Sequence, residues 1–206
     1  MFLRRLRTSA VLRRASKDGG VLAAIRAELA HELSSSAPSS PPSFDSQEAP
    51  DFTTVSDAPK AQDVLLRRRT DSEEVLVSAL LGPLQFADQE PLPRAALMKV
   101  FVAKPGSRPA LHFDCRTVGE DGGAVDYAIT NFRYHSAPGD AGDDKYEGPQ
   151  FRQLHHRLQA ALQEYLVARG VTSNLACSIL HHLLQKERFQ YVNWLKTLEE
   201  RFTKDN

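Results

Sequence analysis

Short runs in which apolar and polar residues alternate fill the middle of the chain, between residues 51 and 135. A period of two places successive side chains on opposite faces of a β-strand. Turn-forming residues at 70–72 and 104–106 separate the runs, which predicts antiparallel strands with short connections. No helical pattern interrupts them, and this argues against a parallel, doubly wound sheet. The predicted strands are 52–56, 64–69, 73–81, 97–103, 110–115 and 125–134.

Each predicted strand has one apolar face and one mixed face. Met98, Val100 and Val102 form the apolar face of one strand, and residues 99, 101 and 103 between and after them are of mixed polarity. Residues 110–115 and 125–130 alternate in the same way. An apolar sheet face has to be covered by another layer. The link over residues 82–96 contains three prolines and is predicted to be a loop.

Two C-terminal helices supply the predicted cover, which makes the fold class α+β. Apolar residues recur every three or four positions from Leu154 to Leu166, and Arg169-Gly170 is a typical helix end. A longer helix follows Thr172-Ser173 and runs almost to the end of the chain. Its wide apolar stripe suggests two partners, the sheet and another subunit, although all of it could instead fill the core of a monomer. The candidate subunit-interface residues are Leu183, Phe189, Trp194, Leu198 and Phe202.

The N-terminal part reads as three segments before a domain over residues 51–206. Residues 1–20 begin with six basic and no acidic residues up to Lys17, a composition typical of a mitochondrial transit peptide. A chloroplast address has an overlapping composition, and a basic tail that binds anionic partners is the alternative. Residues 21–33 predict a short helix, and the Ser/Pro-rich residues 34–50 predict a flexible tether.

Charge narrows the class of partner. Lys and Arg total 26 and Asp and Glu total 26, so the chain is not a globally basic nucleic-acid coat protein, and direct DNA binding is not expected. Without the first 17 residues the chain has 20 basic against 26 acidic residues, a net charge of −6. The sequence contains no run of 18 apolar residues, so no transmembrane helix is predicted.

Candidate chemistry is sparse. No phosphate loop, dinucleotide fingerprint or nucleophile elbow occurs, and no catalytic residue, metal ligand set or cofactor site is predicted. Cys115 and Cys177 are expected to be packing residues, and the doublets at 155–156 and 181–182 cannot each converge on one ion. One loop is strongly acidic, and it is either a solvated loop or a binding lip for a basic partner. Its acidic residues are Asp140, Asp143, Asp144 and Glu147.

Several segments resemble the mitochondrial glycoprotein family of acidic mitochondrial matrix proteins, and a plant member in particular. Their order, their spacing and the L-x-x-R-G turn coincide with the family pattern over about residues 50–206. The family is usually more acidic than this chain, and often has an acidic insertion where residues 82–96 lie. The residues that carry the resemblance are Val100–Gly106, Leu111–Cys115, Tyr146–Pro149, Leu158–Val171, Asn174–Ala176, Glu187 and Trp194–Lys196.

The resemblance implies a highly twisted antiparallel sheet of six or seven strands, with one N-terminal and two C-terminal helices. Residues 145–147 would supply the seventh strand. It also implies a ring-shaped homotrimer in the mitochondrial matrix, whose channel the mixed strand face with Lys99, His112 and Asp114 would line. Family members are binding proteins linked to mitochondrial translation, ribosome assembly, oxidative phosphorylation and chaperone-like retention of basic proteins. The alternative function is a structural assembly factor that docks a partner helix on the apolar C-terminal stripe.

Overall fold

A computed structural model describes residues 6–34, 40–44, 49–88, 90–104, 110–119, 124–135, 146 and 148–204. The chain divides into two compact units. One is the sheet unit, Ser43–Leu184, and the other is the helical unit, which combines Met1–Pro42 with Gln185–Asn206. The longest helix, α3 (Ser173–Lys204), contributes its first part to the sheet unit and its second part to the helical unit.

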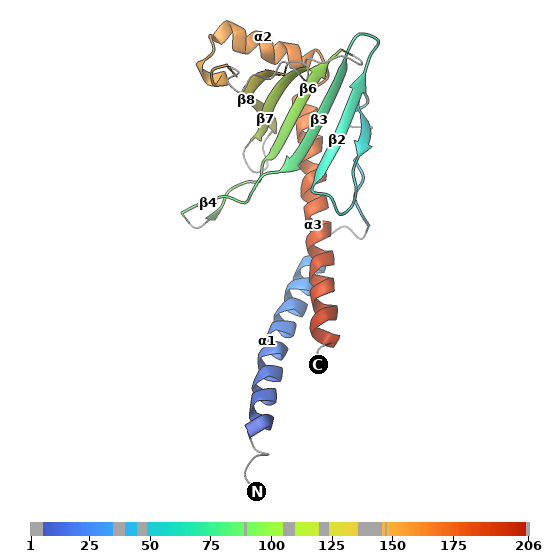
Figure 1. The fold of residues 1–206 in the computed structure, drawn as a ribbon, viewed down its shortest axis with the longest axis vertical. Helices are drawn as coiled ribbons and strands as arrows, with labels where there is room; N and C mark the ends of the chain where they lie inside the picture. Colours follow the sequence, from blue (N-terminus) through green and yellow to red (C-terminus); the bar gives the residue numbers. More distant parts are fainter. Residues whose placement is uncertain are drawn as a thin grey trace. The chain divides into compact units, whose positions relative to one another are not determined.

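The sheet unit contains a six-stranded antiparallel sheet in the order β1-β2-β3-β6-β7-β8 (Figure 1). Neighbours in the sheet follow one another along the chain, except that a small hairpin is inserted between β3 and β6. The antiparallel sheet predicted from alternation is confirmed, and β7 extends three residues beyond its predicted end. The strands are β1 (Thr53–Ser56), β2 (Asp63–Arg69), β3 (Glu74–Leu81), β6 (Ala96–Ala103), β7 (Ala110–Val118) and β8 (Asp126–His135).

The link over residues 82–96 was predicted to be a loop, and this prediction is wrong in part, because the link contains two short paired strands. Phe86 of β4 (Phe86–Ala87) pairs with Pro91 of β5 (Glu90–Pro91), and the backbone N–H of Leu92 donates to the carbonyl of Gln85 at 2.8 Å. Proline is tolerated there because so short a ladder needs few backbone donors. Asp88 makes the turn with a positive φ of 48°.

One face of the sheet forms the core. Along β3 and β6 every second side chain is buried, including Val77 and Val100, as the alternation predicts. The first part of α3 lies behind the strands in Figure 1, and Leu175, Ile179 and Leu183 of that helix belong to the same core cluster. The expectation that the C-terminal helices cover the apolar face is therefore confirmed.

A β-bulge between β7 and β8 changes which residues of β8 face this core. Asp114 is opposite Asn131 and Cys115 is opposite Ile129, so Thr130 is an extra residue in the ladder. The Thr130 hydroxyl donates to the Asp114 carbonyl at 3.0 Å. Because the bulge shifts the alternation by one, Ile129 is buried and Phe132, three residues later, packs against the same core.

The connection between α2 (His156–Val167) and α3 ends at the predicted Arg169-Gly170 stop. The N–H of Val171 donates to the Leu166 carbonyl at 3.1 Å and that of Gly170 to the Val167 carbonyl at 3.0 Å, which is a Schellman motif. Gly170 has a φ of 81°, which disfavours any other residue. Thr172 then caps α3, because its hydroxyl accepts the N–H of Leu175 at 3.3 Å. A short 3₁₀ helix, η1 (Phe151–Gln153), precedes α2.

The Ser/Pro-rich segment is not a free tether throughout its length. Phe44 and Ala49 are buried in the core cluster of the sheet unit. The N–H of Phe44 donates to Asp57 at 3.3 Å, and its ring lies edge-on to His182. These two apolar residues explain the difference, because burying them in the core offsets the chain entropy that is lost when this part of the segment becomes ordered.

The helical unit pairs α1 (Leu6–Ser34) with the second part of α3. The helix predicted over residues 21–33 begins earlier, at Leu6, and Gly19-Gly20 does not interrupt it. Contacts run from Arg26–Glu199 at 2.8 Å to Glu32–Arg188 at 3.3 Å, so the two helices are antiparallel. Among the described residues of this unit, the buried apolar ones are Ile25, Val192 and Leu195.

Candidate binding surface on the open face of the sheet

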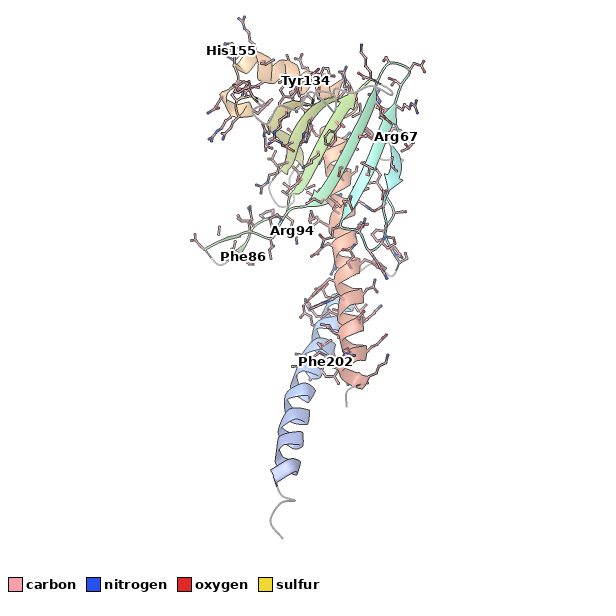
Figure 2. All side chains as sticks on the ribbon, in the orientation of Figure 1. Arg67, Phe86, Arg94, Tyr134, His155 and Phe202 are labelled. Carbon is pink, nitrogen blue, oxygen red and sulfur yellow. The ribbon has the colours of Figure 1, made fainter. Side chains whose placement is uncertain are left out.

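The sheet face opposite the core carries the side chains that alternate with the buried ones, and we call it the open face. Among the described residues of the sheet unit, no helix lies over it in Figure 1. Figure 2 shows Arg67, which belongs to this face, on β2. The open face includes Asp63, Leu65, Arg67 and Arg69 of β2, Glu74, Leu76, Ser78 and Leu80 of β3, Leu97, Lys99 and Phe101 of β6, His112, Asp114, Arg116 and Val118 of β7, and Asp126, Ala128, Asn131 and Arg133 of β8.

One half of the open face is apolar. Leu80 is opposite Leu97 in the β3–β6 ladder, and these side chains are 44% and 38% exposed. Leu76 is opposite Phe101 in the same ladder, and both are half-buried, as is Leu65 on β2. Cross-strand neighbours of this kind form one continuous surface, because opposite Cβ atoms are about 4.5–5.5 Å apart.

The other half is polar and centres on Asp114. Its Oδ1 lies 3.2 Å from His112 Nε2, and its Oδ2 accepts from Arg133 Nη1 at 3.3 Å. The Phe101 ring stacks on the imidazole with centroids 4.4 Å apart. His112 is therefore only 4% exposed, whereas Lys99 is exposed and Asp114 is half-buried. Of the three residues predicted to line a channel, His112 is therefore buried, whereas Lys99 and Asp114 are accessible on the open face.

Lys99 and Arg116 are the accessible cations beside this centre. Arg116 donates to the neutral amide oxygen of Gln85 at 3.3 Å. Within the described part of the chain, no carboxylate forms an ion pair with Lys99, Arg116 or Arg69.

The candidate interface residues on α3 are divided between the two units. Leu183 is buried in the core of the sheet unit, whereas Phe189, Leu198 and Phe202 are half-buried in the helical unit. Trp194 is 55% exposed, and its ring stacks on Tyr191 with centroids 5.9 Å apart. The predicted acidic lip, Asp140, Asp143, Asp144 and Glu147, lies outside the described residues, as do Lys145 and Glu147 of the suggested seventh strand.

Cys115 occupies a packing position, and His155 occupies a capping position. Burial, with a smaller contribution from Asp114, raises the pKa of the Cys115 thiol to about 12, so that the thiol is not a nucleophile at neutral pH. His155 caps α2 by accepting the N–H of Arg157 at 3.3 Å. Among the described residues, no three His, Cys, Asp or Glu side chains are grouped as metal ligands. Nor does any helix in this part of the chain have the length and apolar content to cross a membrane.

Two contacts between ionisable side chains, the first buried and the second half-buried, were not expected from the sequence. His182 Nε2 lies 3.0 Å from Asp57 Oδ2, which joins α3 to the segment after β1. Arg169 binds Glu73 through Nε and Nη2, at 3.1 and 2.8 Å, and its guanidinium lies 3.4 Å from the centroid of the Tyr165 ring. In each case the partners are far apart in the sequence, and no local pattern signals such a pair.

Comparison with known structures bears on the fold. The Trypanosoma brucei p22 protein superposes with a TM-score of 0.66 at 23% identity, covering 91% of this chain and 99% of that one. A Leishmania major protein described as a homologue of human p32 superposes with the same TM-score at 19% identity, covering 90% of this chain and 99% of that one. These likenesses show that the fold is shared.

Comparison of sequences bears on the family. The mitochondrial acidic protein mam33 of Schizosaccharomyces pombe is 34% identical over 56 residues, which is 27% of this chain and only 21% of that relative. The family model described as mitochondrial glycoprotein matches residues 85–202, from the β4–β5 hairpin to the last turns of α3. That span is more than half of the chain and includes both C-terminal helices. The chain therefore belongs to the mitochondrial glycoprotein family.

Proposed function

We propose that the protein is a non-enzymatic, homotrimeric binding protein of the mitochondrial matrix. It acts as an adaptor or chaperone-like scaffold that supports mitochondrial translation, ribosome assembly or oxidative phosphorylation. Family membership supports a mitochondrial location. The family and the p32-like structural neighbours are not known as enzymes. The homotrimer, the location in the matrix and the roles in translation, ribosome assembly or oxidative phosphorylation are proposed because the family resemblance implies them.

The observation that carries a binding role is the surface left uncovered on the sheet unit. Leu80 and Leu97 are adjacent, exposed and continuous with the half-buried Leu76 and Phe101. Large contiguous apolar patches on a folded chain are typical of interaction sites. On the helical unit, Trp194 is also exposed, and it is among the residues proposed to pack between subunits.

Two modes of partner capture follow from this proposal. In the first, the acidic residues 140, 143, 144 and 147 attract a basic protein, and a trimer multiplies the net charge of −6 per chain threefold. In the second, a partner helix docks on the apolar side chains of α3, for which Trp194 is the accessible anchor. Salt distinguishes the modes, because screening weakens only the first.

Analytical ultracentrifugation of the full chain at micromolar concentration tests the assembly. We expect a single species with three times the mass of the chain. A chain that sediments as a monomer over this range would contradict the trimer.

Affinity purification from isolated mitochondria at low and high salt tests the binding role. Partners that are lost at high salt support capture by charge, whereas partners that persist support apolar docking. Recovery of no partner under either condition would count against an adaptor.

A further inference from the structure

The open face has an excess of basic side chains, whereas the chain without its predicted transit peptide has an excess of acidic ones. Residues 18–206 have a net charge of −6. The strand residues of the open face include five basic side chains and four acidic ones. One of the acidic residues, Asp126 at the start of β8, accepts the Ser173 hydroxyl of α3 at 2.7 Å. The basic residues are Arg67, Arg69, Lys99, Arg116 and Arg133, and the acidic ones are Asp63, Glu74, Asp114 and Asp126.

Ion pairing within the face leaves the positive charge in excess. Asp114 is paired with Arg133 and His112, and Glu74 lies 3.9 Å from Arg67. Lys99 and Arg116 are exposed, and no described carboxylate pairs with either. A cation that none of the described carboxylates neutralises can bind an anionic partner.

These two cations lie beside the exposed leucines. Arg116 is opposite Leu97, and Lys99 is two residues further along the same strand, so Lys99 and Arg116 are diagonal neighbours about 7–8 Å apart at their Cα atoms. Leu97 is in turn opposite Leu80. We define Leu80, Leu97, Lys99 and Arg116 as the Lys99 patch. The β4–β5 hairpin begins close by, since its Gln85 binds Arg116, and it carries the exposed Phe86 (Figure 2).

We propose that the Lys99 patch docks an acidic, partly apolar segment of a protein partner. Carboxylates of the segment bind Lys99 and Arg116, and its apolar side chains pack on Leu80 and Leu97. A protein segment fits better than a single-stranded nucleic acid, because bases need accessible aromatic rings for stacking. On the sheet itself the aromatic ring of this face, Phe101, is already stacked on His112.

This inference rests on the binding role proposed above but assigns it a different surface and a different charge of partner. The acidic lip and the apolar stripe of α3 suit basic or apolar partners. The Lys99 patch suits an acidic one, and a chain with both kinds of surface can hold two partners of opposite charge together.

Fluorescence anisotropy with the full chain tests the site. The probe is a labelled peptide of three Glu-Leu-Asp-Ser repeats, which presents carboxylates and leucines in alternation. We expect it to bind, and the double variant Lys99→Gln, Arg116→Gln to weaken binding about tenfold, because two charge contacts are lost. Leu97→Gln should also weaken binding severalfold.

The matched control is Arg157→Gln, Lys196→Gln, which removes the same charge from two exposed positions on the helices. We expect its affinity to remain within about twofold of that of the unaltered chain. Equal losses in the two double variants would show that only net charge matters and would overturn the site. A lysine version of the peptide that binds as tightly, or an oligouridylate that binds the patch when the acidic peptide does not, would overturn it too.

Sedimentation of the same variants separates this inference from the proposed assembly. A trimer that fails to bind the acidic peptide overturns the Lys99 patch and leaves the trimer standing. A monomer that binds the peptide through Lys99 and Arg116 supports the patch and overturns the trimer.

Discussion

Cys115 and Tyr127 show how burial sets the chemistry of single groups in this sheet. The two residues lie on the core face of β7 and β8, and burial is the largest cause of the raised pKa of each. Each group is therefore held in its neutral form. The Tyr127 hydroxyl donates to the Val171 carbonyl at 2.8 Å, so its proton also forms a link between β8 and the α2–α3 connection.

Alkaline pH should weaken the fold through Cys115. The pKa of the thiol is raised to about 12 in the folded chain, above its ordinary value, so its contribution is complete below the ordinary pKa and is lost as the pH rises toward 12. We expect urea unfolding to show a loss of about 1 kcal/mol from this group between about pH 8 and pH 10. Cys115→Val should show a smaller loss over the same interval, and an equal loss would contradict this account.

Tyr127→Phe should destabilise the sheet unit. The change removes the buried hydrogen bond to Val171 and leaves a carbonyl without that donor, at an expected cost of about 1–2 kcal/mol in the free energy of unfolding. Tyr146→Phe is the control, since Tyr146 is an exposed tyrosine of the sheet unit and its substitution should have almost no effect. Chemical denaturation of both variants measures the difference.

Among the elements, the connection between α2 and α3 has the most specific local requirements. Gly170 combines a left-handed backbone with close packing, because a Cβ built there would lie 3.2 Å from the Phe52 ring. Arg169 extends from the same turn to Glu73 at the start of β3. The turn therefore anchors the helical layer to the sheet at one defined place.

Gly170→Ala should lower the free energy of unfolding by about 2 kcal/mol, from backbone strain and from displacement of Phe52. Gly148→Ala is the matched comparison. Gly148 has a similar φ of 91°, but a Cβ there meets nothing within 4 Å, so only the strain of about 1 kcal/mol remains. Thermal unfolding of the two variants should separate the two contributions, and equal shifts would show that the contact with Phe52 costs nothing.

The sequence predicts the elements better than it predicts their contacts. Alternation locates all six strands of the sheet, because a half-buried strand needs a period of two, and Arg169-Gly170 marks the helix end by local chemistry. No residue pattern in the sequence indicates the bulge at Thr130. The β4–β5 hairpin was not predicted, because the prolines of this link favour a loop.

The open face could be predicted only in part. The mixed composition of its strands is visible in the sequence, but the burial of His112 depends on Phe101 and Arg133, which join it only through the register of three strands. Nor could the sequence show that, among the described residues, Asp114 pairs with Arg133 and Glu74 with Arg67, and that no carboxylate pairs with Lys99 or Arg116.

The whole molecule carries one tryptophan, and its position makes it a reporter of assembly. Trp194 is exposed on the helical unit of a single chain. If it packs between subunits, as we propose, its fluorescence should shift to the blue when trimers form and to the red on dilution. A spectrum that does not change while the mass triples would place Trp194 outside the interface.

Trp194→Ser should weaken the proposed trimer, because large aromatic anchors dominate interface energies. We expect about a tenfold rise in the concentration needed for assembly, measured by sedimentation. Tyr134→Ser, which alters an exposed aromatic residue of the sheet unit, is the control and should leave assembly unchanged.

The order of the elements along the chain has a consequence for how the protein is made. All six strands precede Leu166, Leu175 and Leu183, which cover their apolar face. A ribosome that releases about 5–20 residues per second leaves that face bare for several seconds after β8 has emerged. Such an interval favours aggregation of the nascent chain, so the yield of soluble protein should depend on chaperones that hold the growing polypeptide until its last helix is complete.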